Sequence, residues 1–528
     1  MAEPCPEHST ASHACHGDLL AWRDVPRTDS APFVHKFQTN RQKYVYDGNT
    51  RRIIRVSPVV WDVIEDFGCK DGRQVIAGHS SRWNGEEITA AMREIAQAQK
   101  EQGLFLSNRP RQIRLPGKEM IKKRLDEQRE QLILNVTEDC NFRCSYCVYG
   151  GGYPEYRAHS ARKMSWDVAR AAITEFMSHS GGTEGRVISF YGGEPLLNLP
   201  LIRRCVAFAR QGWSDPAVRF SMTTNGYLLR GRAAEFLADE GFTITISLDG
   251  PADIHDRHRR TKGGAPTWAQ VAANIRGLLA AHPEYRTNHR LRFAAVATRT
   301  TDLGEIQRFL GSCELFADGM GLEVSGQEQP TDKPEPLLPD DPLVLSTKVL
   351  RQEFVDGLKS GAFLVEHACR SRWVQTSVFQ KAFVTFHKRG FLSPHLPETM
   401  VILSPCLPGA RRAFVNAGGG YYACERVLEC QEGLIGNVHE GVSLDRVMAL
   451  LDRWIQANHD QCRYCWCLSW CRVGCFANVG EKGVVTRESK QKACSLHRRS
   501  MHQLLTEYCD ILEENHRAFD YTAALALM

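Results

Sequence analysis

Residues 134–151 read LNVTEDCNFRCSYCVYGG, and this stretch decides the fold and chemistry that the sequence predicts. It places Cys140, Cys144 and Cys147 directly after a run of apolar and β-branched residues. Structural zinc usually takes four protein ligands, so zinc is the weaker interpretation of a three-cysteine group. Three thiolates on a [4Fe–4S] cube leave one iron free to bind a small molecule. We therefore predict an iron–sulfur site here.

A second group of cysteines lies near the C-terminus of this 528-residue chain, which has 19 cysteines. Four of them form Cys462-x2-Cys465-x5-Cys471-x3-Cys475, with Cys406 and Cys424 before them and Cys494 after them. In a chain without an export signal, cysteines at such spacings favour metal or catalytic sites over disulfides. The C-terminal group alone also fits a zinc ribbon, and the other nine cysteines fit buried apolar positions.

The composition is that of a globular protein rather than a disordered or membrane chain. Hydrophobic residues make up 43% and charged residues 24%, with a mean hydropathy of −0.35. No apolar run approaches the roughly 18 residues that a spanning helix needs, and the first residues lack the apolar core of a secretory signal. A net charge of +5, from 66 basic and 61 acidic residues, does not require a nucleic-acid partner. We expect a cytoplasmic protein of several domains.

Between residues 131 and 330, short β-branched runs alternate with amphipathic segments. The strand candidates are residues 132–136, 187–191, 218–224, 243–248, 291–298 and 321–325. Helix patterns lie between them, such as SWDVARAAITEFMSH at 165–179. Consecutive βα units of this kind predict a parallel sheet with right-handed crossovers, which curls into a partial barrel. The fold class is therefore α/β, with a partial (β/α)6 barrel.

Glycine and small polar residues follow the ends of these strands. The cysteine triple follows the first strand, GGEP (192–195) follows the second, TNG (224–226) ends the third and SLDG (247–250) ends the fourth. Each alone is also an ordinary strand-to-helix turn. Sites on parallel sheets lie at the carboxyl ends of the strands, where glycine lets a ligand approach the backbone. Four such ends together predict one ligand site at this edge.

With these motifs, residues 131–330 resemble the radical S-adenosylmethionine (SAM) superfamily, through CxxxCxYC and the following GGEP. Residues 401–495 resemble its SPASM extension, which holds two auxiliary [4Fe–4S] clusters. The resemblance implies that Cys140, Cys144 and Cys147 hold a [4Fe–4S] cluster that binds SAM and cleaves it to a 5′-deoxyadenosyl radical. It also implies SAM contacts from Tyr146, Gly192, Gly193, Glu194, Thr224, Asn225, Ser247 and Arg259.

The resemblance assigns Cys406, Cys424 and Cys475 to the first auxiliary cluster and Cys462, Cys465, Cys471 and Cys494 to the second. Fully ligated relatives carry a further cysteine six residues after the first, where this chain has Arg412. The first cluster is then left with an open iron, or with a fourth ligand from Cys430 or Cys467. Glu425 lies where some relatives place a proton acceptor, which makes it the candidate catalytic residue; a solvated glutamate is the other interpretation.

Residues 34–108 carry a different pattern, with alternation around Asp47-Gly48-Asn49 that signals a hairpin. Strands, two helices and a last short strand at 104–107 predict a winged-helix-like domain. It resembles the leader-recognition element of enzymes that modify ribosomally made peptides (RiPPs), which binds a leader as an added strand. A structural cap and a DNA-reading winged helix are the alternatives.

The sequence predicts the following domain boundaries. They are a disordered tail over 1–20, the winged-helix-like domain over 21–108, a linker helix over 109–130, the barrel over 131–330, a proline-rich connector over 331–400, the SPASM domain over 401–498, and a C-terminal helix and tail over 499–528.

These resemblances predict a radical SAM oxidoreductase that takes hydrogen from a ribosomally made precursor peptide and forms a thioether or carbon–carbon cross-link. The expected partners are the precursor peptide, bound through its leader, and reduced flavodoxin or ferredoxin as electron donor, with no nucleic acid and no membrane. A sulfatase-maturing, formylglycine-forming enzyme is the alternative within the superfamily. Nucleotide-directed cofactor biosynthesis is less favoured because no glycine-rich tail ends the chain. A zinc-stabilised winged-helix regulator is the alternative from another class, and it leaves the GGEP, TTNG and SLDG series unexplained.

Overall fold

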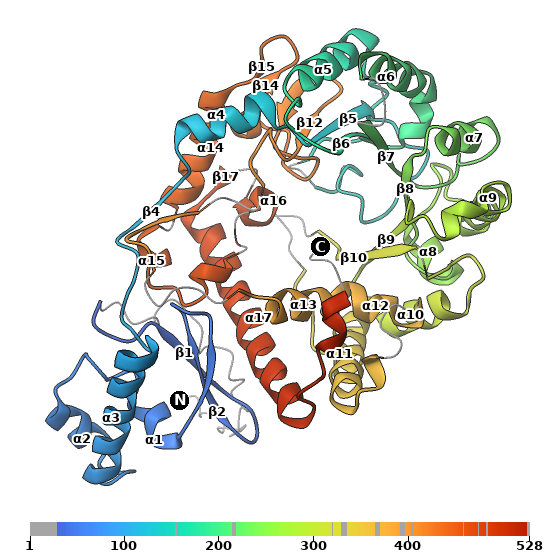
Figure 1. Ribbon diagram of the computed structural model, residues 1–528. Helices are drawn as coiled ribbons and strands as arrows, with labels where there is room; N and C mark the ends of the chain where they lie inside the picture. Colours follow the sequence, from blue (N-terminus) through green and yellow to red (C-terminus); the bar gives the residue numbers. More distant parts are fainter. Residues whose placement is uncertain are drawn as a thin grey trace, which may run out of the picture.

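The computed structural model describes residues 29–153, 156–213, 218–318, 320–328, 335–364, 370–390, 396–402, 406–457, 459–471, 473, 475–481 and 484–524. The tail predicted over 1–20 lies outside the described residues. Figure 1 shows a curved central sheet with helices on its outer side and the N-terminal domain (residues 29–108) at lower left. Within the described ranges, no helix is long and apolar enough to cross a membrane.

Six parallel strands form the barrel sheet, in the order in which they occur along the chain. They are β5 (Gln131–Thr137), β6 (Arg186–Gly192), β7 (Val218–Thr224), β8 (Thr243–Ser247), β9 (Leu291–Ala297) and β10 (Gly321–Gly326). Each predicted strand agrees with one of these to within one residue at either end. The α/β fold class and the partial (β/α)6 barrel are therefore confirmed.

Helices cover the outer face of this sheet (Figure 1). They are α5 (Trp166–Ser178), α6 (Leu199–Gly212), α7 (Arg232–Asp239), α8 (Ala252–His258), α9 (Trp268–Ala281) and α10 (Leu303–Ser312). Ser165 begins α5 as its cap, because its hydroxyl accepts the Val168 N–H at 3.2 Å. Buried Phe190, Phe220 and Phe242 pack with ring centroids 5.5–6.4 Å apart, and this apolar core holds the strands in place.

The cysteine-rich region (residues 406–494) continues the barrel sheet. Its strands are β12 (Ala413–Val415), β13 (Gly420–Tyr422), β14 (Leu434–Asn437) and β15 (Gly441–Val442). β12 pairs in parallel with β5 and the other three follow antiparallel, which gives a sheet of ten strands. This join was not predicted from the sequence. The later elements are α14 (Leu444–Gln456), α15 (His459–Cys462), α16 (Phe476–Val479), β16 (Gly480–Glu481), β17 (Val484–Val485) and α17 (Arg487–Glu514).

Segment 331–400, predicted as a connector, contains helices. They are α11 (Pro342–Ser360), α12 (Trp373–Gln375) and α13 (Lys381–His387), and they pack on α10 and α17. Pro342 stands in the first turn of α11, where its missing N–H costs nothing, so a proline that signalled a connector begins a helix. The predicted linker helix over 109–130 is shorter: β4 (Gln112–Arg114) pairs with β11 (Thr399–Val401), and α4 spans Lys118–Glu127.

The N-terminal domain is an antiparallel sheet with three helices. Its elements are β1 (Val34–Gln38), β2 (Lys43–Asp47), β3 (Ile53–Val56), α1 (Pro58–Val63), α2 (Gly72–His79) and α3 (Gly85–Gln102). No strand forms at 104–107; there the Phe105 N–H instead donates to the buried Asp47 carboxylate at 2.6 Å. The domain has a core of its own, whereas Phe37, Tyr44 and Tyr46 belong to the same buried cluster as the barrel.

Candidate functional site

The cysteine loop begins where β5 ends, so the carboxyl edge of the sheet sets its position. Cys140 is buried, and its sulfur accepts a hydrogen bond from the Phe142 N–H at 3.4 Å. Burial is the main cause that raises the pKa of Cys140 to about 12, and the nearby thiols of Cys144 and Cys147 contribute to this rise. Burial raises the pKa of Cys144 to about 11, against the effect of Arg259. The structure thus brings the three predicted ligands together.

Two glycines hold the loop after β6 against the cysteine loop. A Cβ at Gly192 would lie 2.2 Å from the carbonyl oxygen of Thr137, and a Cβ at Gly193 would lie 2.2 Å from that of Asp139. The Gly193 N–H donates to the Thr137 carbonyl and the Glu194 N–H to the Asp139 carbonyl, both at 2.8 Å. Because any side chain would collide with backbone, glycine is required at both positions. The two loops therefore form one backbone unit.

Glu194 joins the second and third strand ends. Its buried carboxylate accepts hydrogen bonds from the Thr224 hydroxyl at 2.7 Å and from the Asn225 N–H at 2.8 Å. Burial raises the pKa of Glu194 to about 7, although these donors oppose the rise. The Asn225 amide donates to Asn141 at 2.8 Å and lies 3.9 Å from the Cys140 sulfur. Three predicted SAM contacts thus form one network with the cysteine loop.

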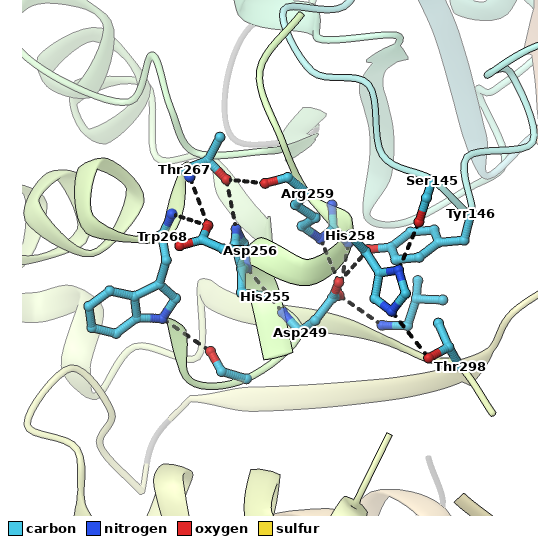
Figure 2. Close-up of polar contacts among 12 residues, drawn as sticks. Ser145, Tyr146, Asp249, His255, Asp256, His258, Arg259, Thr267, Trp268 and Thr298 are labelled. Atoms are coloured by element: carbon cyan, nitrogen blue, oxygen red, sulfur yellow. Dashed lines mark hydrogen bonds and ion pairs between the residues drawn. The ribbon is translucent and has the colours of Figure 1, made fainter. Parts of the chain in front are cut away.

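Asp249, two residues beyond β8, is the centre of a second network (Figure 2). Its carboxylate accepts two hydrogen bonds from Arg259, at 2.9 and 3.0 Å, one from the Tyr146 hydroxyl, and one from the Val296 N–H at 3.0 Å. Burial alone would raise the pKa of Asp249, but the Arg259 guanidinium holds that pKa below its usual range. Asp249 therefore orients both Tyr146 and Arg259, which the sequence analysis assigned to SAM.

Asp249 and His258 were not among the site residues predicted from the sequence. The ring nitrogens of His258 lie 2.7 Å from the Ser145 hydroxyl and 3.3 Å from the Thr298 hydroxyl, so this side chain links the cysteine loop to the end of β9 (Figure 2). The only sequence signal for Asp249 and His258 was their position: Asp249 lies in the SLDG turn and His258 lies just before Arg259. Ser247, a predicted contact, ends β8 at the same edge and is partly buried.

The donor set of the cysteine loop suits an iron–sulfur cluster. Cys140, Cys144 and Cys147 are free thiols that lie close together, and thiolates are the ligands that iron–sulfur clusters select. Among the residues that the structure describes, no three His, Cys, Asp or Glu side chains form a group that could hold a single metal ion. A cube of four irons holds its thiolates farther apart than a single ion does.

Cys406, Cys424 and Cys475 lie together around an ion pair. Burial raises the pKa of Cys406 and that of Cys424, the latter to about 12, and Cys475 and Glu425 add to both shifts. Arg412, which stands in the place of the missing cysteine, donates to the Glu425 carboxylate at 3.1 Å. The structure thus brings the three predicted ligands of the first auxiliary cluster close to Arg412, the residue that departs from the pattern.

The second C-terminal group comes from α15, the loop after it and α17. Burial is the main cause that raises the pKa of Cys462 to about 12, and the nearby thiols of Cys465, Cys471 and Cys494 contribute to this rise. Cys467, considered above for the first cluster, instead hydrogen-bonds to Cys465. That bond, with Arg498, lowers the pKa of Cys465 to about 7 against the effect of burial. The structure therefore places Cys467 with the second group.

Comparison with known families matches residues 134–288 to the model of the Radical SAM superfamily. A cysteine-type anaerobic sulfatase-maturating enzyme of Clostridium perfringens is 28% identical over 142 residues, which cover 26% of this chain and 38% of the relative. A GTP 3′,8-cyclase of Xanthomonas campestris pv. campestris is 31% identical over 258 residues, which cover 44% of this chain and 70% of the relative. The chain spans 44%, 38% and 33% of the first three curated relatives.

Among solved structures, native anSMEcpe with bound AdoMet aligns with a TM-score of 0.51 and 17% identity. The alignment covers 75% of this chain and 100% of that protein. At this identity the likeness concerns the fold alone. It extends well beyond residues 134–288, which the family model matches.

Proposed function

The chain belongs to the radical SAM superfamily, and from that premise we propose that it is a peptide maturase of the SPASM type. It removes hydrogen from a ribosomally made precursor peptide and joins two atoms of that peptide by net oxidation, as a thioether or a carbon–carbon bond. The cofactors of the superfamily are a [4Fe–4S] cluster and SAM, which supply a 5′-deoxyadenosyl radical when bound and reduced.

In this proposal the carboxyl edge of the barrel sheet is the active site. Cys140, Cys144 and Cys147 hold the cluster, and the networks of Glu194 and Asp249 keep the loops around it in place. The remaining expected SAM contacts are Gly192, Gly193, Thr224, Asn225, Ser247, Tyr146 and Arg259, and these come from the loops and strand ends at this edge. The barrel also keeps water away from the reacting carbon.

One observation supports a peptide as the substrate. The N-terminal sheet packs on α17, the helix that also contains Cys494. The His35 ring stacks on Trp466 with centroids 3.8 Å apart, and its Nε2 lies 2.9 Å from Nδ1 of His502. Farther along α17, the Tyr44 hydroxyl donates to Glu513 at 2.8 Å. These contacts hold β1 and β2 against α17 and against Trp466 of the cysteine-rich region.

The other edge of the N-terminal sheet is the strand β3. In the described part of the chain β3 pairs with β2 alone, so its outer edge has no strand partner. An unpaired edge is a template for an extended peptide, which adds to it through backbone hydrogen bonds. A leader bound there is held next to the cysteine-rich region, while the rest of the peptide reaches the barrel.

The two C-terminal cysteine groups hold auxiliary clusters in this proposal. Net oxidation requires the substrate radical to lose a second electron after the hydrogen atom has gone, and auxiliary clusters held by these cysteines would accept that electron. Reduced flavodoxin or ferredoxin supplies the first electron from outside.

Maturation of a sulfatase, in which a cysteine or serine becomes formylglycine, is the second candidate. The sequence likeness to a sulfatase-maturating enzyme favours it. The edge of β3 that has no strand partner among the described residues favours the first candidate, because a leader peptide could bind there.

The deciding experiment is anaerobic co-expression with each short open reading frame that flanks the gene, followed by mass spectrometry of the peptides. Cross-linking gives a loss of about 2 Da per event, and the Cys140→Ala, Cys144→Ala, Cys147→Ala triple variant removes it. Unchanged masses while SAM is still cleaved would reject cross-linking. Oxidation of a sulfatase-derived peptide alone would favour the second candidate.

A further inference from the structure

Among the described residues, one carboxylate oxygen of Glu425 has a hydrogen-bond partner and the other has none. Its Oε1 accepts from Nη1 of Arg412 at 3.1 Å, whereas Oε2 is buried and has no hydrogen-bond partner among the described residues. The side chain as a whole is only 17% exposed. A carboxylate oxygen taken out of water without a partner raises the free energy of the folded state. The position therefore calls for a cation or a donor beside Oε2.

The surrounding thiols point to an iron of a cluster as that cation. Glu425 acts electrostatically on both Cys406 and Cys424, and Cys475 acts on the same two thiols. These three cysteines are the proposed ligands of the first auxiliary cluster, so three irons of its cube have a ligand and the fourth has none. Arg412, in place of the further cysteine, is a cation and does not bind iron.

The two cysteines considered as substitutes have other surroundings. Cys467 hydrogen-bonds to Cys465 in the second group. Cys430 precedes the 3₁₀ turn Gln431–Gly433, and its thiol contributes to the raised pKa of the Tyr422 hydroxyl. Carboxylates are established ligands of protein-bound iron, so the chemistry of Glu425 suits the vacant position.

We propose that Oε2 of Glu425 is the fourth ligand of the first auxiliary [4Fe–4S] cluster, and that Arg412 is a positioning residue that holds the other oxygen. This inference rests on the proposed function, which puts a cluster at this site. The deprotonated carboxylate donates an electron pair to iron, and no electron is transferred in forming the bond. An oxygen bound to iron does not accept a proton from the substrate, so Glu425 is a ligand rather than the expected proton acceptor.

The test uses the full chain with Cys140, Cys144 and Cys147 changed to Ala, so that only auxiliary clusters remain. This parent is expected to hold about eight irons per chain. During mild oxidation it keeps both four-iron clusters, whereas the same protein with Glu425→Ala loses about one iron and shows the electron paramagnetic resonance (EPR) signal of a [3Fe–4S] cluster. Glu425→Cys offers another iron ligand and restores resistance to oxidation.

Glu328→Ala is the matched control. This carboxylate also pairs with an arginine near Cys424, Arg426, at 3.2 Å, but it is 49% exposed, and its loss leaves both clusters resistant to oxidation. If Glu425→Ala does not fold, Glu425→Gln keeps the volume and a weaker oxygen donor, and its cluster loses iron faster than the parent's.

Three results would overturn the inference. The first is equal behaviour of the parent and Glu425→Ala, whether both lose iron or neither does. The second is normal cluster spectra in a Glu425→Ala enzyme that retains Cys140, Cys144 and Cys147 but no longer modifies peptide. This result would favour proton transfer as the role of Glu425. The third is a parent without iron at the C-terminal cysteines, and this result alone also rejects the auxiliary clusters of the proposed function.

Discussion

The guanidinium of Arg259 donates two hydrogen bonds to the carboxylate of Asp249, at 2.9 and 3.0 Å, and both side chains are almost out of contact with solvent. Their exposed fractions are 8% for Arg259 and 1% for Asp249. Removing one partner of such a buried pair leaves the other charge uncompensated, at a cost of about 3–5 kcal/mol. The pair is therefore a sensitive point of the barrel site.

We predict that Asp249→Asn weakens SAM binding and lowers the free energy of unfolding by about 3–5 kcal/mol. Arg259 loses its counter-charge and the Tyr146 hydroxyl loses an ionised acceptor. Anaerobic calorimetric titration with SAM and urea unfolding measure the two effects. Asp253→Asn, in the exposed first turn of α8, is the control and leaves both unchanged. Wild-type affinity for SAM in Asp249→Asn would contradict the orienting role of this carboxylate.

A second prediction concerns the contact between the two loops. Gly193→Ala puts a Cβ about 2.2 Å from the Asp139 carbonyl oxygen, so the loops must separate, at a cost of at least about 1–3 kcal/mol. We expect the iron content after reconstitution to fall by up to about four atoms per chain, one cluster's worth. Gly152→Ala is the control, because no heavy atom lies within 4 Å of its added Cβ. Equal iron content in the two variants would show that the loops tolerate separation.

A third prediction concerns acid stability. His255 is buried, with its ring nitrogens 3.4 Å from the Asp249 amide nitrogen and 3.1 Å from the Thr267 hydroxyl. Burial and Arg259 lower its pKa to about 4, against Asp249 and Asp256. In the unfolded chain the pKa of histidine is near 6.5. Between these values the unfolded state binds more protons, so folding is destabilised as the pH falls from about 6.5 toward 4.

His255→Gln removes this titration. We expect the stability advantage of the wild type over His255→Gln to be constant above about pH 6.5. Below it, the advantage shrinks by up to about 1.4 kcal/mol per pH unit. Urea unfolding of both proteins between pH 7.5 and pH 5 gives the difference directly. A difference that does not vary with pH would mean that His255 titrates normally in the folded protein.

A fourth prediction concerns the leader peptide. Strand addition protects backbone amides at the edge that receives the peptide, so amides of β3 (Ile53–Val56) should exchange more slowly with deuterium when the leader is added. Amides of β1 should not change, because β1 already faces α17. A scrambled leader of the same composition is the control. Protection at β1, or none at all, would place the peptide elsewhere.

The parallel strands were predictable because each is a run of β-branched and apolar residues bounded by turn residues. Val218–Thr224 is such a run, and the structure has the same bounds. The motifs after the strands were predictable for a related reason, since the carboxyl ends of parallel strands meet at one edge. The convergence of Glu194 and Asn225 with the cysteine loop follows from that topology.

The missed features depend on contacts between residues far apart in the chain. β12 has three residues, too few for any periodicity, and it becomes a strand by pairing with Leu132–Leu134 of β5. Asp249 looked like an ordinary turn residue, because its partners Tyr146 and Arg259 are not adjacent to it in sequence. One oxygen of Glu425 has no hydrogen-bond partner in the part of the chain that the structure describes; this depends on its three-dimensional surroundings, and residue type alone does not reveal it.

The packing of β1 and β2 on α17 also affects the order in which parts of the protein fold during synthesis. The N-terminal domain emerges from the ribosome before the barrel and the cysteine-rich region and can form its separate core at once. Its other apolar face, with Phe37, Tyr44 and Tyr46, finds its partners only when Trp466 and α17 have been made, more than 400 residues later. Until then that face is exposed on the nascent chain, so this domain can fold before the barrel but is completed only after it.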